Sequence, residues 1–225
     1  MPPLPDPSSH ETPPHPQTRM AGEDRRRQLI EVAIDLFSRR GFAGTTTREI
    51  AAAAGVTEAI IFRHFTTKQD FYKAILDYKC QGKGASDWLA ITQKFMDADD
   101  DEGLFRMLIS TIVTVYREEP QFERLLLYAA LEGHELAIMH HDQMKLPIGA
   151  KFREYILRRQ QQGALRQCDP AVVLFALAGI PQFYAMQKYI HKHGDLSLTD
   201  EQVVDSFLLI LMNGLKTTAP KGLSK

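Results

Sequence analysis

The sequence has little cysteine: its two cysteines, Cys80 and Cys168, lie far apart and form no CxxC pair. This scarcity excludes a disulfide framework and a cysteine-rich zinc site, and it fits a reducing cytoplasm. No apolar run approaches the ~18 residues of a membrane span. The start of the chain also lacks the positive charge and apolar stretch of a signal peptide. We therefore expect a cytoplasmic protein with no membrane partner.

An excess of charge of either sign is also missing. The 225 residues include 27 Lys and Arg against 28 Asp and Glu, a formal charge of −1, and 44% are hydrophobic. Such a composition is typical of a globular protein of one or two domains, and it excludes a uniformly basic nucleic-acid binder. The charge is uneven, however, because residues 19–79 hold 11 basic against 8 acidic side chains, whereas residues 80–225 hold 16 against 18. The N-terminal part therefore remains compatible with a DNA partner.

Proline is sparse except at the N-terminus, where residues 1–18 carry seven of the twelve prolines. With few large apolar side chains, this segment cannot offset its chain entropy by burial, so residues 1–21 are predicted to form a disordered tail. Beyond the tail, apolar residues follow a helical period, turn residues recur at short intervals, and no alternating strand pattern is found. The predicted fold class is all-α.

Four short helices are expected before residue 81, over 24–40, 47–54, 58–64 and from 68 onward. Gly41 follows the first helix as a left-handed C-cap. The second helix begins after Thr46, which has the spacing of a capping box with Glu49. For the fourth helix, Thr66 and Gln69 repeat that spacing, and Phe71, Ile75 and Tyr78 are expected to point inward.

Residues 47–63 have the spacing of a helix-turn-helix. Gly55 supplies the turn, and the apolar side chains of Ile50 and Ile61 lock the two helices together. With those residues inside, the outward face of the second helix consists of Glu58, Ala59, Phe62 and Arg63. A helix of this size fits the major groove of DNA.

Longer helices are expected over 86–97, 102–118, 121–133, 136–161, 170–192 and 200–217. Pro120 and Pro170 fall at helix starts, where a missing N–H costs nothing. Thr199 and Gln202 form another capping-box pair, and Pro181 is expected to kink its helix. The last two helices are apolar around most of their circumference. One face is expected to pack on a second subunit, the alternative being deep burial inside one large monomer.

Three motifs follow one another within residues 25–76: GFAGTTTREIA at 41–51, GVT at 55–57 and IFRHFTTK at 61–68. With these motifs, residues 25–76 resemble the DNA-binding domain of the tetracycline-repressor (TetR) family. The resemblance implies a three-helix DNA-binding domain over 22–67, a connecting helix over 68–80 and a helical ligand-binding and dimerisation domain over 81–218. It also implies a four-helix dimer interface within 170–217, and a flexible C-terminus is expected over 219–225.

Residue by residue, the family pattern makes Thr47 and Arg48 contacts to the groove and phosphates, and Glu58 and Ala59 base-reading positions. Phe62 departs from the family's common tyrosine, so it lacks a hydroxyl for a phosphate. For Arg25, Arg26 and Arg27 in the first helix, and for His64, the alternative of a solvent-exposed side chain without a DNA contact stays open. The predicted DNA-binding residues are Arg25, Arg26, Thr46, Thr47, Arg48, Thr57, Glu58, Ala59, Phe62, Arg63, His64 and Lys68.

An effector pocket is expected to be apolar with a few polar anchors, although most aromatic and methionine side chains at helical spacing belong to a core. The apolar candidates are Trp88, Phe105, Tyr116, Phe122, Tyr128, Met144, Phe152, Tyr155, Phe183 and Met186. The polar candidates are Glu132, His134 and Gln182. No metal site or cofactor is expected, because His140 and His141 are adjacent on a helix and point about 100° apart. No catalytic arrangement is evident.

These features predict a homodimeric DNA-binding transcriptional regulator. A repressor is favoured, bound to a pseudo-palindromic operator and released by a small-molecule effector with an apolar part. Two alternatives remain open. One is an all-α small-molecule carrier or enzyme with a structural N-terminal hairpin. A bound cofactor or turnover, together with the absence of DNA affinity in the protein, would favour it. The other is a regulator controlled by a protein partner.

Overall fold

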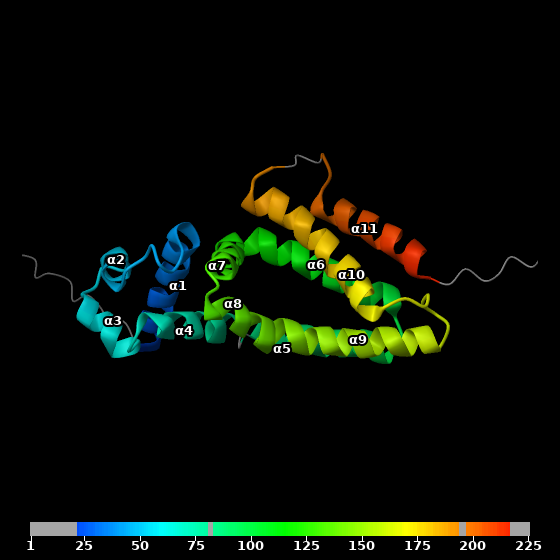
Figure 1. Cartoon of the computed structure of the whole chain (residues 1–225), viewed down its shortest axis with the longest axis horizontal. Coiled ribbons are helices and arrows are strands. Elements are labelled where there is room, and N and C mark those ends of the chain that lie inside the picture. Colours follow the sequence, from blue (N-terminus) through cyan, green and yellow to red (C-terminus); the bar gives the residue numbers. More distant parts are fainter. Residues whose placement is uncertain (1–21, 81–82, 194–196, 217–225) are drawn as a thin grey trace, which may run out of the picture.

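The computed structural model describes residues 22–80, 83–193 and 197–216. Over these ranges every regular element is a helix, apart from one isolated β-bridge between Leu165 and Lys216. The all-α prediction is therefore confirmed. Helices α1 to α4 gather at one end of an elongated molecule, and the longer helices form its body (Figure 1). The tail predicted at 1–21 and the C-terminus predicted at 219–225 lie outside the described residues.

Four helices build the N-terminal end, and their bounds agree with the prediction to within two residues. They are α1 (Gly22–Arg40), α2 (Thr47–Ala53), α3 (Glu58–His64) and α4 (Lys68–Cys80). Two of the turns between them need glycine, because Gly41 has a φ of +69° and Gly55 a φ of +66°. At such angles a side chain would collide with its own backbone.

Helix α4 begins at Lys68 as predicted, but its capping residue differs from the prediction by one position. The Thr67 hydroxyl accepts a hydrogen bond from the Asp70 N–H at 3.2 Å, and the Asp70 carboxylate accepts one from the Thr67 N–H at 2.8 Å. The prediction of Thr66 and Gln69 as the cap was wrong. Thr67 directly precedes the first helical residue, and a carboxylate three residues later can accept from its free N–H.

The inward face of α4 also differs in part. Phe71 and Ile75 are completely buried, as expected, but Tyr78 is 38% exposed and its hydroxyl donates to Glu31 on α1 at 3.2 Å. The prediction that Tyr78 points inward was wrong. Tyr72 and Leu76 fill the core instead, because one turn of helix separates them on the side that faces α1.

The body consists of longer helices, two of which are interrupted by π-helical turns. They are α5 (Lys83–Asp97), α6 (Asp101–Glu118), α7 (Pro120–Leu131), α8 (Glu135–His140), η1 (His141–Lys145), α9 (Leu146–Gln161), α10 (Pro170–Ala185), η2 (Met186–Ile190) and α11 (Asp200–Leu215). Pro120 and Pro170 begin their helices, and Thr199 with Gln202 forms the expected capping box.

The helix predicted over 136–161 is split into α8, η1 and α9. Pro147 stands near the start of α9 and has no N–H to donate to the carbonyl of Gln143, four residues earlier. A π-helical turn accommodates such a lost bond without ending the helix. Pro181 lies inside α10, which continues through it, and the predicted kink remains a prediction.

Two clusters of buried apolar side chains hold the molecule together. The first joins α1 to α4 with Phe122 and Leu125 of α7 and Leu136 of α8. The second joins α6, α9, α10 and α11 around side chains such as Phe105 and Phe152. Helices α7 and α8 therefore pack against α1 to α4, and the N-terminal end is joined to the body through this first cluster.

The segment Pro170–Ile190 is long and apolar enough, by length and composition alone, to cross a membrane, with a mean hydropathy of 1.3 and one third of its window buried. The expectation that no segment approaches such a span was therefore wrong. Gly179, Pro181 and Gln182 break the apolar run in the sequence, yet the average over the helix stays high. A single such helix is weak evidence for a membrane, and α10 packs against α6 and α11.

Candidate DNA-binding surface and ligand cavity

Helices α2 and α3 form a rigid pair joined by the turn at Gly55. Ile50 and Ile61 are completely buried and Ala51 is 3% exposed, so the two helices are locked from inside. Ala59 and Arg63 are exposed on α3, and Phe62 is 52% exposed, which is unusual for a large aromatic side chain. Such an exposed apolar ring is suited to a partner surface.

The N-terminus of α2 is fixed by the predicted capping box. The Thr46 hydroxyl accepts from the Glu49 N–H at 3.2 Å, and the Glu49 carboxylate accepts from the Thr46 N–H at 2.8 Å. The hydrogen bonds from Thr46, together with the neighbouring Arg40 guanidinium, lower the pKa of Glu49. Arg48 is exposed beside this cap, where a phosphate could reach it.

Two of the predicted groove contacts are paired with each other. The Thr47 hydroxyl on α2 donates a hydrogen bond to the Glu58 carboxylate at the start of α3. This bond ties the two helices together and occupies one oxygen of Glu58. The neighbouring Thr57 and Ala59 are exposed and accessible to a base edge.

Two other predicted DNA contacts, Arg26 and Lys68, bind groups within the N-terminal domain. The Arg26 guanidinium donates to the carbonyl of His64 at 3.0 Å and lies 4.6 Å from the Phe65 ring centroid. The Lys68 ammonium donates to the Phe42 carbonyl and lies 3.9 Å from the Phe42 ring centroid, and burial lowers its pKa. These cations hold the domain together in the structure.

Arg25 and His64 are also engaged. The Arg25 guanidinium donates to the Gln28 side chain at 2.6 Å. Burial, reinforced by the positive charges of Arg26, Arg63 and Arg25, lowers the pKa of His64, so the imidazole is neutral at pH 7. Of the predicted set, the structure brings these residues to the exposed surface of α2, α3 and the turns before them: Thr46, Arg48, Thr57, Ala59, Phe62 and Arg63.

A cavity of about 650 Å³ lies in the body, bounded by α5, α6, α7, η1 and α9 together with the ends of α4 and α8. Its walls are mainly apolar, and the aromatic rings of Trp88 and Phe122 contribute to them. A volume of this size suits a small organic ligand. The charged or titratable side chains in the wall are Lys79, Glu119, Glu123, His140 and Lys151.

The polar groups of the cavity have distinct surroundings. Lys79, near the end of α4, pairs with Glu119 at 2.6 Å. Burial raises the pKa of Glu123, and its carboxylate accepts a hydrogen bond from the Tyr116 hydroxyl. Burial lowers the pKa of His140 to about 4, so this imidazole is neutral at pH 7.

The predicted ligand residues are distributed over several places. Trp88, Phe122 and Met144 line the cavity, whereas Phe105 and Phe152 are buried in the core beside it. Tyr116 and Gln182 lie behind Glu123, since the Gln182 amide donates to the Tyr116 hydroxyl at 3.1 Å. Met186 packs against the second core cluster, and Phe183 is 60% exposed on α10.

Glu123 was missed at the sequence level, along with Lys79, His140 and Lys151. The available signal was its position in α7, PQFERLLLYAAL, where it is the single acidic residue among mostly apolar neighbours and directly follows Phe122. A lone acid in such a helix can indicate a functional carboxylate. Its cavity-facing position depends on how α6 and α7 pack, which the pattern does not give.

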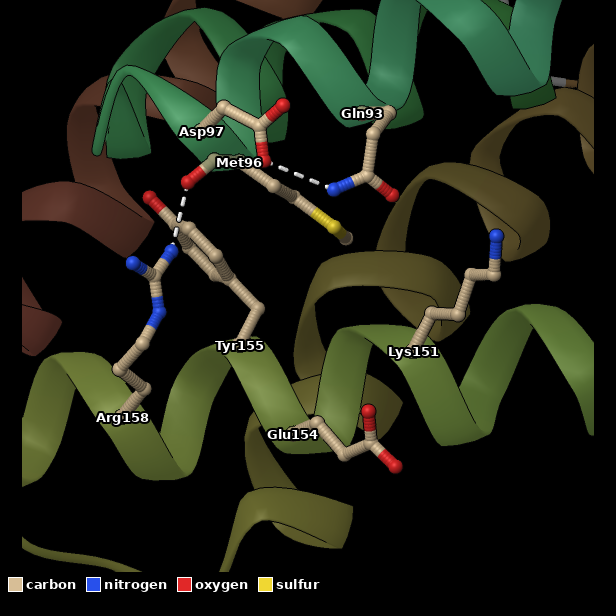
Figure 2. Close-up of a pocket in the computed structure, with 7 residues that line it drawn as sticks. All are labelled: Gln93, Met96, Asp97, Lys151, Glu154, Tyr155 and Arg158. Carbon is tan, nitrogen blue, oxygen red and sulfur yellow. Dashed lines mark hydrogen bonds between the residues drawn. The ribbon is translucent and has the colours of Figure 1, made fainter.

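A second, smaller pocket of about 330 Å³, called the outer groove below, lies between α5 and α9 (Figure 2). Arg158 donates to the Met96 carbonyl at 2.6 Å, and Gln93 donates to Asp97 at 2.9 Å. Tyr155 contributes to this pocket and not to the larger cavity. One of these bonds joins the two helices, from the Arg158 side chain to the Met96 backbone, and most of the lining side chains are polar or charged, so the pocket is a polar groove.

The remaining ligand candidates, Tyr128, Glu132 and His134, contact α1 and the loop between α1 and α2. The Glu132 carboxylate accepts a hydrogen bond from the Phe42 N–H at 3.2 Å, and the Phe42 and His134 rings lie 4.4 Å apart. The Tyr128 hydroxyl donates to the Arg39 carbonyl at 3.5 Å. Among the described residues, no group of three or more His, Cys, Asp or Glu side chains is placed to hold a metal ion.

An exposed helix-turn-helix, joined through α4 to a helical body that contains a ligand-sized cavity, defines a DNA-binding transcriptional regulator. The family model described as bacterial regulatory proteins of the tetR family matches residues 29–75. The N-terminal helices of this chain therefore match the DNA-binding domain of the TetR family, and the chain is similar to regulators of that family.

The chain is similar to curated transcriptional regulators and to solved structures. The chain is 29% identical over 160 residues to the transcriptional regulator TtgR of Pseudomonas putida, covering 70% of this chain and 67% of TtgR. It is 26% identical over 200 residues to RutR of Escherichia coli, covering 85% of this chain and 91% of RutR. A solved structure of AibR with isovaleryl coenzyme A and operator DNA is 28% identical, with a TM-score of 0.64, covering 84% of this chain and 98% of AibR.

Proposed function

We propose that this protein is a cytoplasmic repressor that binds a pseudo-palindromic operator as a homodimer and leaves it when a small molecule occupies the 650 Å³ cavity. The observation that carries the proposal is the position of Lys79. This residue lies near the end of α4, the helix that follows the DNA-binding domain, and its side chain forms part of the cavity wall. A ligand in the cavity therefore contacts the element that leads to the DNA-binding surface.

The domain division predicted from the sequence is retained in this proposal. Residues 22–67 bind DNA, α4 connects, and residues 81–218 bind the effector and the second subunit. Each subunit places α3 in a major groove, with Ala59 and Phe62 toward the bases and Arg48 and Arg63 available for phosphates. Two-fold symmetry then requires two half-sites that are about one helical turn, ~34 Å, or a multiple of it apart.

The dimer interface is proposed on α10 and α11. Phe175 and Phe183 on α10 are 77% and 60% exposed, and Leu209 and Ile210 on α11 are similarly exposed. An apolar surface of this kind on two neighbouring helices is costly in water and is relieved when the same face of a second copy covers it. The apolar composition of α10 is explained in this way without a membrane.

Two contacts are proposed to couple the cavity to DNA binding. The Lys79–Glu119 ion pair joins α4 to the corner between α6 and α7. The Glu132 carboxylate, after α7, accepts from the Phe42 N–H in the loop between α1 and α2. A ligand that shifts α7 moves both contacts, and it changes operator affinity only to the extent that it prefers one of the two arrangements.

The effector is proposed to be a small organic molecule with an apolar part. The mainly apolar walls and the volume support this. The AibR structure holds isovaleryl coenzyme A, a molecule that contains an apolar acyl group, at 28% identity to this chain. An organic effector in a cavity of the body is therefore compatible with this architecture.

Selection of bound sequences from a random DNA pool by the full-length protein tests the proposal. We expect enrichment of an inverted repeat, and protection of both half-sites in a footprint. Addition of small molecules that raise the melting temperature of the protein should then release the operator, since a ligand of the native state stabilises it. A protein that enriches no sequence would contradict the proposal.

A further inference from the structure

We propose that the cavity takes an organic cation with an apolar body, and that the carboxylate of Glu123 is the group that pairs with the cation. This inference rests on the proposed function in one respect, because it takes the 650 Å³ cavity to be the effector site. It adds the charge of the ligand and the residue that selects it.

The position of Glu123 is set by a chain of hydrogen bonds. The Gln182 amide on α10 donates to the Tyr116 hydroxyl on α6 at 3.1 Å. That oxygen is thereby an acceptor, and its own proton is donated to Glu123 on α7. The carboxylate is thus held at the cavity wall by groups that orient it without neutralising it.

The other charged groups of the wall are already compensated or lie at the surface. Lys79 and Glu119 neutralise each other at 2.6 Å, and His140 carries no charge at pH 7. Lys151 is exposed and also borders the outer groove, and Lys145, whose charge acts on Glu123, is exposed as well. Glu123 is therefore the half-buried charge of the wall that lacks a counter-ion at contact distance among the described residues.

A carboxylate in an apolar wall is costly to ionise, and this cost is the reason that burial raises its pKa. A ligand cation removes the cost by pairing with the carboxylate, so binding of a cation is favoured over binding of a neutral or anionic molecule of the same shape. An anion would instead meet the uncompensated carboxylate of Glu123 in the same wall.

The aromatic side chains of the cavity favour the same ligand. Trp88 and Phe122 are both in the wall, and the faces of aromatic rings attract cations. The structure already contains one such contact, since the Lys79 ammonium lies 5.7 Å from the Phe122 ring centroid. The Trp88 ring is held in place by its N–H, which donates to the Thr111 hydroxyl at 2.9 Å.

Two ions of the same shape and opposite charge test the inference. Tetraphenylphosphonium and tetraphenylborate both carry four phenyl groups around a central atom. Trp88 is the chain's single tryptophan, so its fluorescence reports occupation of the cavity directly. With the full-length protein, we expect tetraphenylphosphonium to bind at least tenfold more tightly than tetraphenylborate.

The Glu123→Gln variant should lose this preference for the cation, with the two ions binding within about threefold of each other. The matched control is Glu154→Gln, which removes an exposed carboxylate from the outer groove and should retain the wild-type preference. A preference that follows Glu154 and not Glu123, or tighter binding of the anion by the wild-type protein, would overturn the inference. The wild-type comparison decides even where a variant folds poorly.

Operator binding, measured in the same samples by fluorescence anisotropy, separates this inference from the proposed function. Operator released by neutral or anionic compounds and unaffected by the phosphonium ion would overturn the choice of a cation and leave the repressor intact. A protein that binds no operator at all would overturn the repressor itself, whereas the comparison of the two ions in the cavity would still be decided by Trp88.

Discussion

At the scale of single residues, local spacing predicts helix ends well because a cap is made by neighbours in the sequence. The boxes at Thr46 with Glu49 and at Thr199 with Gln202 could be predicted for this reason. The cap of α4 could not be placed as surely, because Thr66 and Thr67 are adjacent and each is followed three residues later by a suitable acceptor. The structure selects Thr67, which pairs with the stronger acceptor, Asp70.

The cap of α4 gives a matched pair of variants. We expect Thr67→Ala to lower the free energy of unfolding by about 1 kcal/mol, since the Asp70 N–H loses its acceptor. Thr66→Ala should change it by less than about 0.5 kcal/mol, as is usual for a surface substitution. Urea denaturation followed by circular dichroism measures both. A larger loss for Thr66→Ala would contradict the assigned cap.

Two glycines should respond to alanine with opposite sign. Gly41 has a φ of +69°, and a Cβ there would collide with the Glu132 carboxylate, so Gly41→Ala should destabilise the protein by at least about 1–2 kcal/mol. Gly149 lies inside α9 with open space around it, so Gly149→Ala should stabilise by up to about 1 kcal/mol. Chemical denaturation of the two variants measures the difference, and equal effects would contradict the description of the Gly41 turn.

At the scale of elements, the helix-turn-helix is the part that sequence reasoning could place most completely. Its turn at Gly55 and its buried Ile50 and Ile61 all lie within fifteen residues. The wall of the cavity could not be placed in the same way, because Lys79, Glu123 and His140 come from three separate helices. Their proximity depends on packing angles that no local pattern encodes. The π-helical turn before Pro147, which brings His140 and Met144 to the wall, was equally hidden.

The α2–α3 element leads to a prediction about DNA affinity. Arg48 is exposed at the start of α2, so Arg48→Ala should weaken operator binding and reduce the slope of log K against log salt by about 1, the change expected for one phosphate contact. Lys94→Ala removes an exposed cation on α5, within the body, and should leave both quantities unchanged. Fluorescence anisotropy at several salt concentrations tests the pair. An unchanged slope for Arg48→Ala would place the phosphate elsewhere.

At the scale of the whole molecule, the modest positive charge of residues 19–79 becomes effective only when two copies act together. We propose that the copies meet through the apolar face of α10 and α11, and that α7 and α8, which pack against the N-terminal helices, link the cavity of each copy to its DNA-binding end. The sequence suggested the first point from the composition of the helices. For the link between the cavity and the DNA-binding end, the sequence suggested α4 alone, whereas the structure adds the contact between Glu132 and Phe42.

The proposed dimer interface can be tested by a substitution that introduces one charge into it. Phe175→Glu places a carboxylate in the proposed interface, so it should convert the protein to a monomer at micromolar concentration and weaken operator binding at least tenfold. Leu131→Glu changes an equally exposed apolar residue on α7, away from that face, and should leave the dimer intact. Sedimentation velocity distinguishes them. A dimer that survives Phe175→Glu would contradict the interface.

The salt dependence of operator affinity tests the central claim, that this chain recognises DNA through its α2–α3 surface as a symmetric pair, most directly. The measurement is the affinity of the full-length protein for its selected operator as the salt concentration rises from about 50 to about 200 mM. Over this range, phosphate contacts lose much of their contribution to the affinity. We predict a steep linear fall of log K with log salt, and a much weaker affinity for a scrambled duplex throughout. An affinity that stays flat with salt, or that does not distinguish the two duplexes, would contradict the account.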